Sequence, residues 1–164
     1  MRKSYLPLIA VIALAAILYS AAMITLVYNL QPPLNTSSNS NRTPTVNIVL
    51  YEGEVSATRY GFGNTSNTLT SPGPTLRFNL TDVVNITVIN VGKMPHAFAI
   101  TSAPKTGSQI LFNAEIGSAS NPLQPGKQGT VIFTPSNAGS SFFYICPVPG
   151  HAEVGMYGSV IISG

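Results

Sequence analysis

Short runs of β-branched and aromatic residues, separated by turn-forming residues, limit the fold of this 164-residue chain more than any other feature. The clearest run is DVVNITVINVG (residues 82–92), in which Val84, Ile86 and Val88 alternate with polar residues. Such alternation places the apolar side chains on one face of a β-strand. Further runs of this type are TVNIVLY, PTLRFNL, HAFAIT, GTVIFTP, SFFYIC and MYGSVIIS.

Turn-forming segments lie between these runs, for example SPGP, NPLQPGKQG and PSNAG. After residue 30 no stretch keeps the 3.6-residue period of an amphipathic helix. Short strands at this spacing predict an all-β domain, either a β-sandwich or a small barrel. Residues 45–164 are long enough to bury one compact core. The segment Gly53–Thr70 is rich in Gly, Asn and Thr, and its pattern predicts no element.

The N-terminal residues have a different composition. Arg2 and Lys3 precede residues 5–30, which are apolar or small and carry no charge. About 20 such residues span a bilayer as a helix, whereas the apolar core of a cleaved signal peptide has only ~7–15 residues. We therefore expect residues 1–30 to be a transmembrane anchor, with cleavage near Ala21-Ala22 as the alternative. The two basic residues predict a cytoplasmic N-terminus and an extracytoplasmic remainder.

Residues 31–44 (QPPLNTSSNSNRTP) are polar and lack apolar periodicity, which predicts a flexible linker. The expected organisation is thus anchor, linker and a folded domain over 45–164, in a single-pass protein of the cell membrane. Asn-x-Ser/Thr sequons would suit an extracytoplasmic glycoprotein, although a chain rich in Asn, Ser and Thr also produces them by chance. They begin at Asn35, Asn41, Asn64, Asn79 and Asn85.

Charge and cysteine content exclude two classes of protein. From Gln31 onward there are six basic and five acidic residues with no basic cluster. Nucleic-acid binding requires a positive surface, so we expect no nucleic-acid partner. The chain has one cysteine, and an intrachain disulfide framework is therefore excluded.

That cysteine lies in the segment YICPVPGHAEVGMYG, between two predicted strands. Cys146 is followed by His151 and then Met156, with four residues in each gap. Taken singly, a buried cysteine, a core methionine and a surface histidine are ordinary residues. The other histidine of the chain, His96, opens a predicted strand, and a sandwich could bring it to the same end of the domain. The four side chains together predict a metal site.

Two imidazoles, one thiolate and one thioether are the donor set of blue-copper electron-transfer sites. Thiolate and thioether favour copper(I), and imidazole suits copper(II). A structural zinc site is an alternative, but Met is not among the usual zinc ligands. A Cys-His nucleophile is another, for which only Glu153 is near enough in sequence to orient the base.

Residues 72–164 resemble the cupredoxins. PGPTLRFNLTDVVNITVINVG followed by MPHAF is similar to the cupredoxin segment that ends in the first copper histidine. LQPGKQGTVIFTPSNAGSSFFYIC is similar to the strand pair that leads into the copper cysteine. The Cys-x4-His-x4-Met spacing, with Pro-Gly directly before His151, resembles the archaeal sulfocyanins and the bacterial rusticyanins. The predicted anchor and linker are more similar to sulfocyanins.

The resemblance implies a Greek-key β-sandwich that holds one type 1 copper. His96, Cys146 and His151 would be the equatorial ligands and Met156 the axial one. Many cupredoxins have a polar side chain after the first histidine that ties the two ligand loops together. Ala97 stands there in this chain, so that bond would be missing or made by the main chain.

The function implied is that of a monomeric, membrane-tethered carrier of single electrons between respiratory complexes, such as a terminal oxidase, on the outer membrane face. Related copper oxidases need further histidines for additional copper sites. This chain has two, both assigned to one site, so we expect no enzyme activity. The alternatives are a copper transport or storage module and a glycosylated surface protein with a vestigial site.

The ligand loop also suggests a docking surface. We expect it to expose an apolar rim around the edge of His151, through which electrons would leave. The rim residues would be Pro147, Val148, Pro149, Ala152 and Val154.

Overall fold

The computed structural model describes residues 42–164, which belong to one compact unit. The anchor expected at residues 1–30 lies outside the described residues, as do most of the linker and the sequons at Asn35 and Asn41. Within residues 42–164, no helix has the length and apolar character needed to cross a membrane. The transmembrane prediction therefore stays a prediction.

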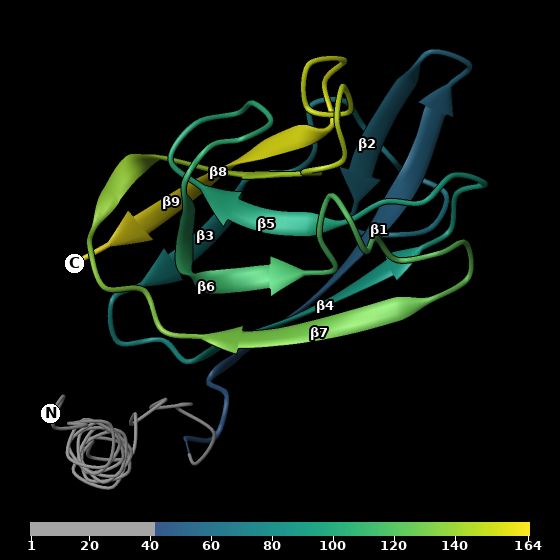
Figure 1. Ribbon diagram of the computed structural model, residues 1–164. Coiled ribbons are helices and arrows are strands. Elements are labelled where there is room, and N and C mark those ends of the chain that lie inside the picture. Colours follow the sequence, from purple (N-terminus) through teal and green to yellow (C-terminus); the bar gives the residue numbers. More distant parts are fainter. Residues whose placement is uncertain (1–41) are drawn as a thin grey trace, which may run out of the picture. The chain divides into compact units, whose positions relative to one another are not determined.

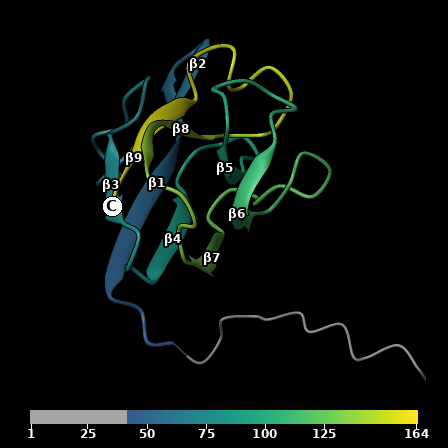
Figure 2. The same cartoon turned by 90° about the vertical axis from the view of Figure 1, so that its left-hand side faces the viewer.

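Within residues 42–164, nine strands form two sheets that pack face to face (Figures 1 and 2). The first sheet has the order β2-β1-β4-β7, and the second has the order β3-β9-β8-β5-β6. In the first sheet the strands are β2 (Arg59–Gly63), β1 (Val46–Ser56), β4 (Val84–Asn90) and β7 (Gln128–Phe133). In the second they are β3 (Leu76–Asn79), β9 (Tyr157–Ser163), β8 (Gly139–Ile145), β5 (Phe98–Thr101) and β6 (Ile110–Ile116).

Each sheet combines strands that are distant in sequence. β1 pairs in parallel with β4, and β3 pairs in parallel with β9. The remaining strand pairs are antiparallel. Parallel partners need a connection that leaves the sheet and returns, so the chain passes between the two layers several times. The prediction of an all-β sandwich is confirmed.

Side-chain alternation explains where the core lies. In β4 every second side chain is buried, as the pattern Val84, Ile86 and Val88 predicts. β3 and β9 alternate in the same way. Their inward faces meet between the sheets and form one apolar core. It includes Leu50, Phe62, Phe78, Phe98, Ile100, Phe133, Tyr144, Val160 and Ile162.

Two strands were not predicted from the sequence. β2 lies within the segment Gly53–Thr70 and is short and glycine-rich, so it has no readable alternation. β6 contains Phe112 and Asn113, whose φ angles of 57° and 52° are left-handed. Such angles are uncommon for residues other than glycine and break the alternation of a regular strand. β2 matters most here, because it lies beside the ligand loop at one end of the sandwich (Figure 1).

Candidate metal centre

The structure brings His96, Cys146 and His151 together. Their donor atoms all lie within 4.8 Å of one another, and all three residues are buried. The Nδ1 atoms of the two imidazoles are 3.1 Å apart, and the Cys146 Sγ is 3.4 Å from the Nδ1 of His151. Within residues 42–164, no other His/Cys/Asp/Glu group is arranged in this way. Three donors that the sequence singled out thus converge, and copper coordination by them stays a prediction.

Strand pairing places the first two ligands side by side. β5 runs antiparallel to β8, with Ala99 opposite Ile145. His96 lies just before β5, and Cys146 lies just after β8, so both fall at the same end of the second sheet. The main-chain N–H of Ala97 donates to the Cys146 Sγ over 3.4 Å. The main chain at Ala97 therefore links the two ligand loops, a link that the alanine side chain cannot form.

A buried amide fixes the segment that carries His96. The Asn90 side chain donates to the carbonyl oxygens of Met94 (2.8 Å) and Leu123 (2.9 Å) and accepts from the N–H of Gly92. His96 and Leu123 also bond to each other through both main-chain groups. Asn90 was not among the residues singled out from the sequence. The signal was a polar residue at the position where the alternation of β4 predicts a buried apolar one.

The ligand loop is closed by its own backbone. The Cys146 N–H donates to the Met156 carbonyl at 3.0 Å, and the Met156 N–H donates to the His151 carbonyl at 2.9 Å. Gly150 and Gly155 have φ angles of 84° and 102°, which residues with a side chain rarely adopt. Met156 is fully buried and belongs to the same core cluster as Cys146. The loop thus places the thioether residue across its base from the thiol.

The predicted apolar rim is partly wrong. Ala152 is buried, because the loop folds back on itself through bonds such as that from the Gly155 N–H to the Ala152 carbonyl. Val148 is half-buried and packs against the core. Val154 is 41% exposed, whereas His151 keeps 8% of its surface exposed. The exposed part of the rim is therefore smaller than the sequence predicted.

The hairpin of β1 and β2 contacts both ligand-bearing segments. The Glu54 carboxylate accepts hydrogen bonds of 2.9–3.0 Å from the N–H groups of Lys93 and Met94, just before His96. Partial burial acts to raise the pKa of Glu54, but these hydrogen bonds prevail and lower it. Glu54 is thus a carboxylate that holds the first ligand loop in place.

Tyr60 on β2 packs against both histidine rings. Its ring centroid is 4.2 Å from that of His151 and 5.3 Å from that of His96. In the connection from β2 to β3, the Ser71 hydroxyl donates to the Gly155 carbonyl at 3.0 Å. No element was predicted for Gly53–Thr70, which contains Tyr60, because its Gly-, Asn- and Thr-rich sequence gives no periodic signal.

Burial keeps the donors neutral in the absence of a metal. It lowers the pKa of His96 to about 4, with a smaller contribution from the charge of His151, and it also lowers the pKa of His151. Burial raises the pKa of the Cys146 thiol to about 12. A thiol must lose its proton to bind a metal. A cation in this site would supply the positive charge that a buried thiolate lacks, so metal binding would release the thiol proton.

The donor set fits one type 1 copper. Two imidazole nitrogens, a thiol sulfur and a nearby buried methionine match the ligands of blue-copper sites. The Nε2 of His96 is also buried and, among the described residues, has no hydrogen-bond partner. The two Nδ1 atoms face each other beside the Cys146 Sγ, so they are the nitrogens placed to bind a metal together with the thiol.

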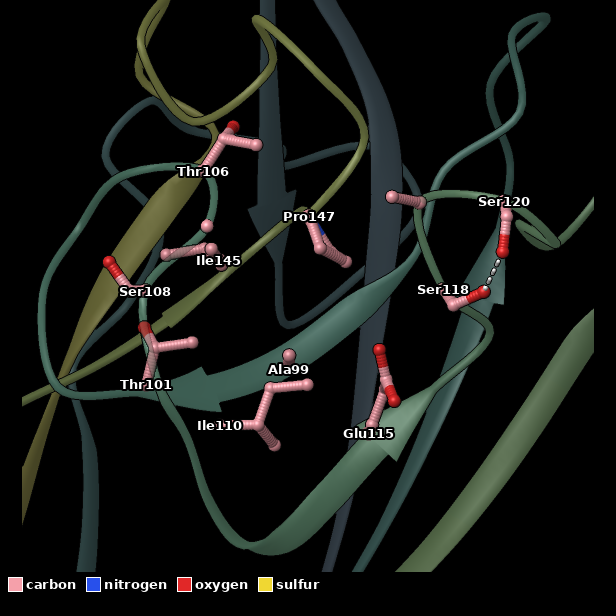
Figure 3. A pocket seen from close by; sticks show the side chains of 12 residues that line it. Ala99, Thr101, Thr106, Ser108, Ile110, Glu115, Ser118, Ser120, Ile145 and Pro147 are labelled. Carbon is pink, nitrogen blue, oxygen red and sulfur yellow. Dashed lines mark hydrogen bonds between the residues drawn. The ribbon is translucent and has the colours of Figure 1, made fainter.

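Figure 3 shows a surface pocket of about 340 Å³. Ile145 and Pro147, which flank Cys146, contribute to its wall, together with Ala99 and Glu115. None of the four predicted ligands lines it. The predicted metal site is therefore not part of the wall of this pocket.

Comparison with known proteins identifies the family. Residues 65–164 match the family model described as multicopper oxidase. The chain is also 32% identical over 93 residues to a rusticyanin of Acidithiobacillus ferridurans. The chain therefore belongs to this copper-protein family and is a cupredoxin. The alignment covers 54% of this chain and 50% of that rusticyanin, so the chain spans about half the length of the curated relatives it matches.

Solved structures agree with this cupredoxin fold. The structure of rusticyanin from Thiobacillus ferrooxidans has a TM-score of 0.55 and 25% identity, and the match covers 73% of this chain and 79% of that one. Auracyanin B has a TM-score of 0.54 over 76% of this chain and 93% of that one. Its identity is 18%, so that likeness concerns the fold alone. The predicted resemblance to the type 1 blue-copper proteins is thus confirmed.

Proposed function

We propose that this cupredoxin is a carrier of single electrons that uses one type 1 copper. The observation that carries the proposal is the convergence of one thiol and two imidazole Nδ1 atoms within 4.8 Å in a buried site. Copper bound there would accept and release one electron by changing between copper(II) and copper(I). His96, Cys146 and His151 would hold it, with Met156 as the axial donor.

The protein's contribution is a rigid, water-free donor set. The Ala97 N–H bond to the Cys146 Sγ and the backbone closure of the ligand loop hold the thiol and the imidazoles in place. Hydrogen bonds of this kind orient metal ligands and tune the metal. Full burial of His96 and Cys146 excludes solvent from the centre. Electron transfer would then require little rearrangement of the ligands.

Burial also separates the carrier function from copper transport or storage. A site that passes copper to other proteins must open to them, whereas His96, Cys146 and Met156 here are fully buried.

An enzyme of the multicopper type needs further copper centres. The chain contains two histidines, and both lie in this cluster. Its own residues therefore cannot build a second imidazole-rich centre, and we propose no catalytic activity.

The absorption spectrum of the copper-loaded protein tests the proposal. We expect an intense visible band on oxidation and reversible bleaching on reduction, because the band requires a copper–thiolate bond. Cys146→Ser should abolish the band. His96→Ala should disrupt it although His96 lies fifty residues from Cys146 in the sequence. A wild-type protein that binds copper without this band, or a Cys146→Ser variant that stays blue, would refute the assignment.

The setting of the carrier is a further part of the proposal. We propose that residues 5–30 anchor a monomeric carrier in the cell membrane, with the copper domain outside the cell and respiratory complexes such as a terminal oxidase as partners. The support is the uncharged apolar stretch preceded by Arg2 and Lys3, and the absence of a basic cluster that would suit nucleic acid. Glycosylation suits Asn64 and Asn79, which are exposed, better than Asn85, whose amide donates to Asn47.

Extraction and mass spectrometry test this setting. An anchored protein should require detergent for extraction, and its native mass should include residues 5–30. A native chain that begins near Ala22 would instead show a cleaved signal peptide.

A further inference from the structure

Glu52 is a buried carboxyl group that the proposed copper site does not use. It lies on β1, and its side chain is fully buried. Both of its carboxyl oxygens lack a hydrogen-bond partner among residues 42–164. Buried polar groups almost always have partners, and a buried charge without a partner is strongly disfavoured. A carboxyl in this position therefore calls for an explanation.

The position of Glu52 connects it to the metal centre. In the first sheet it pairs with Asn90 of β4, whose side chain fixes the His96 segment, and with Phe62 of β2. A negative charge on Glu52 would be felt by the Cys146 thiol, where it adds to the effect of burial in raising the pKa. No hydrogen bond joins Glu52 to the metal cluster within the described part of the chain. Any influence of Glu52 on the centre is thus electrostatic.

No group of opposite charge is bonded to the Glu52 carboxyl among the described residues. β4 has no ionisable side chain, and within residues 42–164 no ion pair or hydrogen bond reaches the Glu52 carboxyl. Burial raises the pKa of Glu52 to about 8. The ionisable groups on the elements around it are Tyr51 and Glu54 on the same strand, Arg59 and Tyr60 on β2, Lys93 before β5, Tyr144 on β8, and Cys146, His96 and His151 in the cluster.

We propose that Glu52 is a proton-holding residue of the copper centre, which stays protonated at acidic and neutral pH and couples the copper potential to pH when it ionises. The proposal rests on the electron-carrier function proposed above. As an uncharged acid, Glu52 does not lower the affinity of the centre for an electron. As a carboxylate, it would favour the oxidised, more positive centre and lower the potential.

The oxidised centre carries one more positive charge than the reduced centre, so Glu52 loses its proton more readily when the centre is oxidised. Glu52 therefore has a lower pKa in the oxidised protein than in the reduced protein. At a pH between these two pKa values, one electron enters the centre, and one proton from solvent converts the Glu52 carboxylate to the carboxylic acid. At lower pH Glu52 is already protonated, and the electron enters without a proton. The potential is then independent of this residue.

Voltammetry of the copper-loaded wild type and of Glu52→Gln tests the coupling. Gln matches the size of the protonated acid and cannot ionise. We expect similar potentials for the two proteins at acidic pH. As the pH rises through the range in which Glu52 ionises in the loaded protein, the potential of the wild type should fall and that of Glu52→Gln should stay level. A tenfold difference in proton affinity between the two redox states corresponds to a total fall of 59 mV.

Glu115→Gln is the matched control. It removes a carboxylate that lines the surface pocket and lies outside the cluster. This variant should reproduce the pH profile of the wild type. If Glu52→Gln shows the same alkaline fall as the wild type, or if Glu115→Gln removes the fall, Glu52 is not the coupled group. The blue band recorded on the same samples separates failure of this inference from failure of the copper assignment.

Infrared spectroscopy of the copper-free protein gives a readout that needs no metal. A protonated carboxyl has its own carbonyl stretching band, which ionised carboxylates lack. We expect the wild type to keep one such band at pH 6–7, where ordinary carboxyls have ionised, and Glu52→Gln to lose it. A wild type without a band that depends on Glu52 would overturn the proposal, even if Glu52→Gln failed to bind copper.

Discussion

Met156 is fully buried and closes the base of the ligand loop opposite Cys146. We predict that Met156→Gln retains copper and lowers its potential, because an oxygen donor favours copper(II) over copper(I) more than a thioether does. A tenfold change in relative affinity for the two states corresponds to about 59 mV. We expect voltammetry to show a decrease of at least that size.

Met94 supplies the control for this residue. It is 46% exposed and precedes His96 by two residues, so Met94→Gln alters a thioether close to the site without touching the core. This variant should keep the wild-type potential. If Met156→Gln binds copper with an unchanged or raised potential, Met156 is not the axial donor.

Among the elements, the β1–β2 hairpin has the clearest role that the sequence did not reveal. Tyr60 covers both histidine rings, so we predict that Tyr60→Ala admits water to the centre, changes its potential and destabilises the protein. The stability loss should be about 2 kcal/mol, less than for a fully buried aromatic residue, because Tyr60 is half-buried. Tyr60→Phe should restore the potential, since the ring and not the hydroxyl makes the contacts.

Voltammetry and denaturant unfolding of both variants check this role. A Tyr60→Ala protein that loses stability but keeps the wild-type potential would make Tyr60 a packing residue only. A Tyr60→Phe protein that behaves like Tyr60→Ala would assign the effect to the hydroxyl group.

Elements with regular alternation could be predicted from the sequence, and irregular ones could not. Buried and partly exposed side chains alternate regularly in β4 and β9, so these strands could be predicted. The Cys-His-Met spacing lies within one loop and could be recognised because it is a local pattern. The approach of His96 to Cys146 depends on the pairing of β5 with β8. The sequence allowed this approach in a sandwich, and the family resemblance then gave His96 its role as a ligand. Tyr60 and Glu52 could not be placed, because their contacts depend on how β2 and β1 pack in three dimensions. The burial of Ala152 depends on the turn within the ligand loop.

At the scale of the whole molecule, two buried groups respond to pH in opposite directions. Burial raises the pKa of Glu52 from 4.5 to about 8, so the folded chain binds more protons there than the unfolded chain between these values. Burial lowers the pKa of His96 from 6.5 to about 4, so the folded chain binds fewer protons there across that range. Stability rises with pH where the unfolded state binds more protons and falls where the folded state does.

The pH dependence of the copper-free protein follows from these signs. Between pH 4.5 and 6.5 the two slopes oppose each other, so the free energy of unfolding should change little on their account. From pH 6.5 to 8, Glu52 is the only one of the two that contributes. The free energy of unfolding should then fall by roughly 2 kcal/mol, at about 1.36 kcal/mol per pH unit. Urea unfolding of wild type and Glu52→Gln across this range measures the fall, which the variant should lack. Equal slopes in the two proteins would mean that Glu52 ionises normally in the folded chain. Bound copper would occupy the imidazoles and remove the His96 protonation, which leaves Glu52 as the group that favours acidic conditions for the loaded protein.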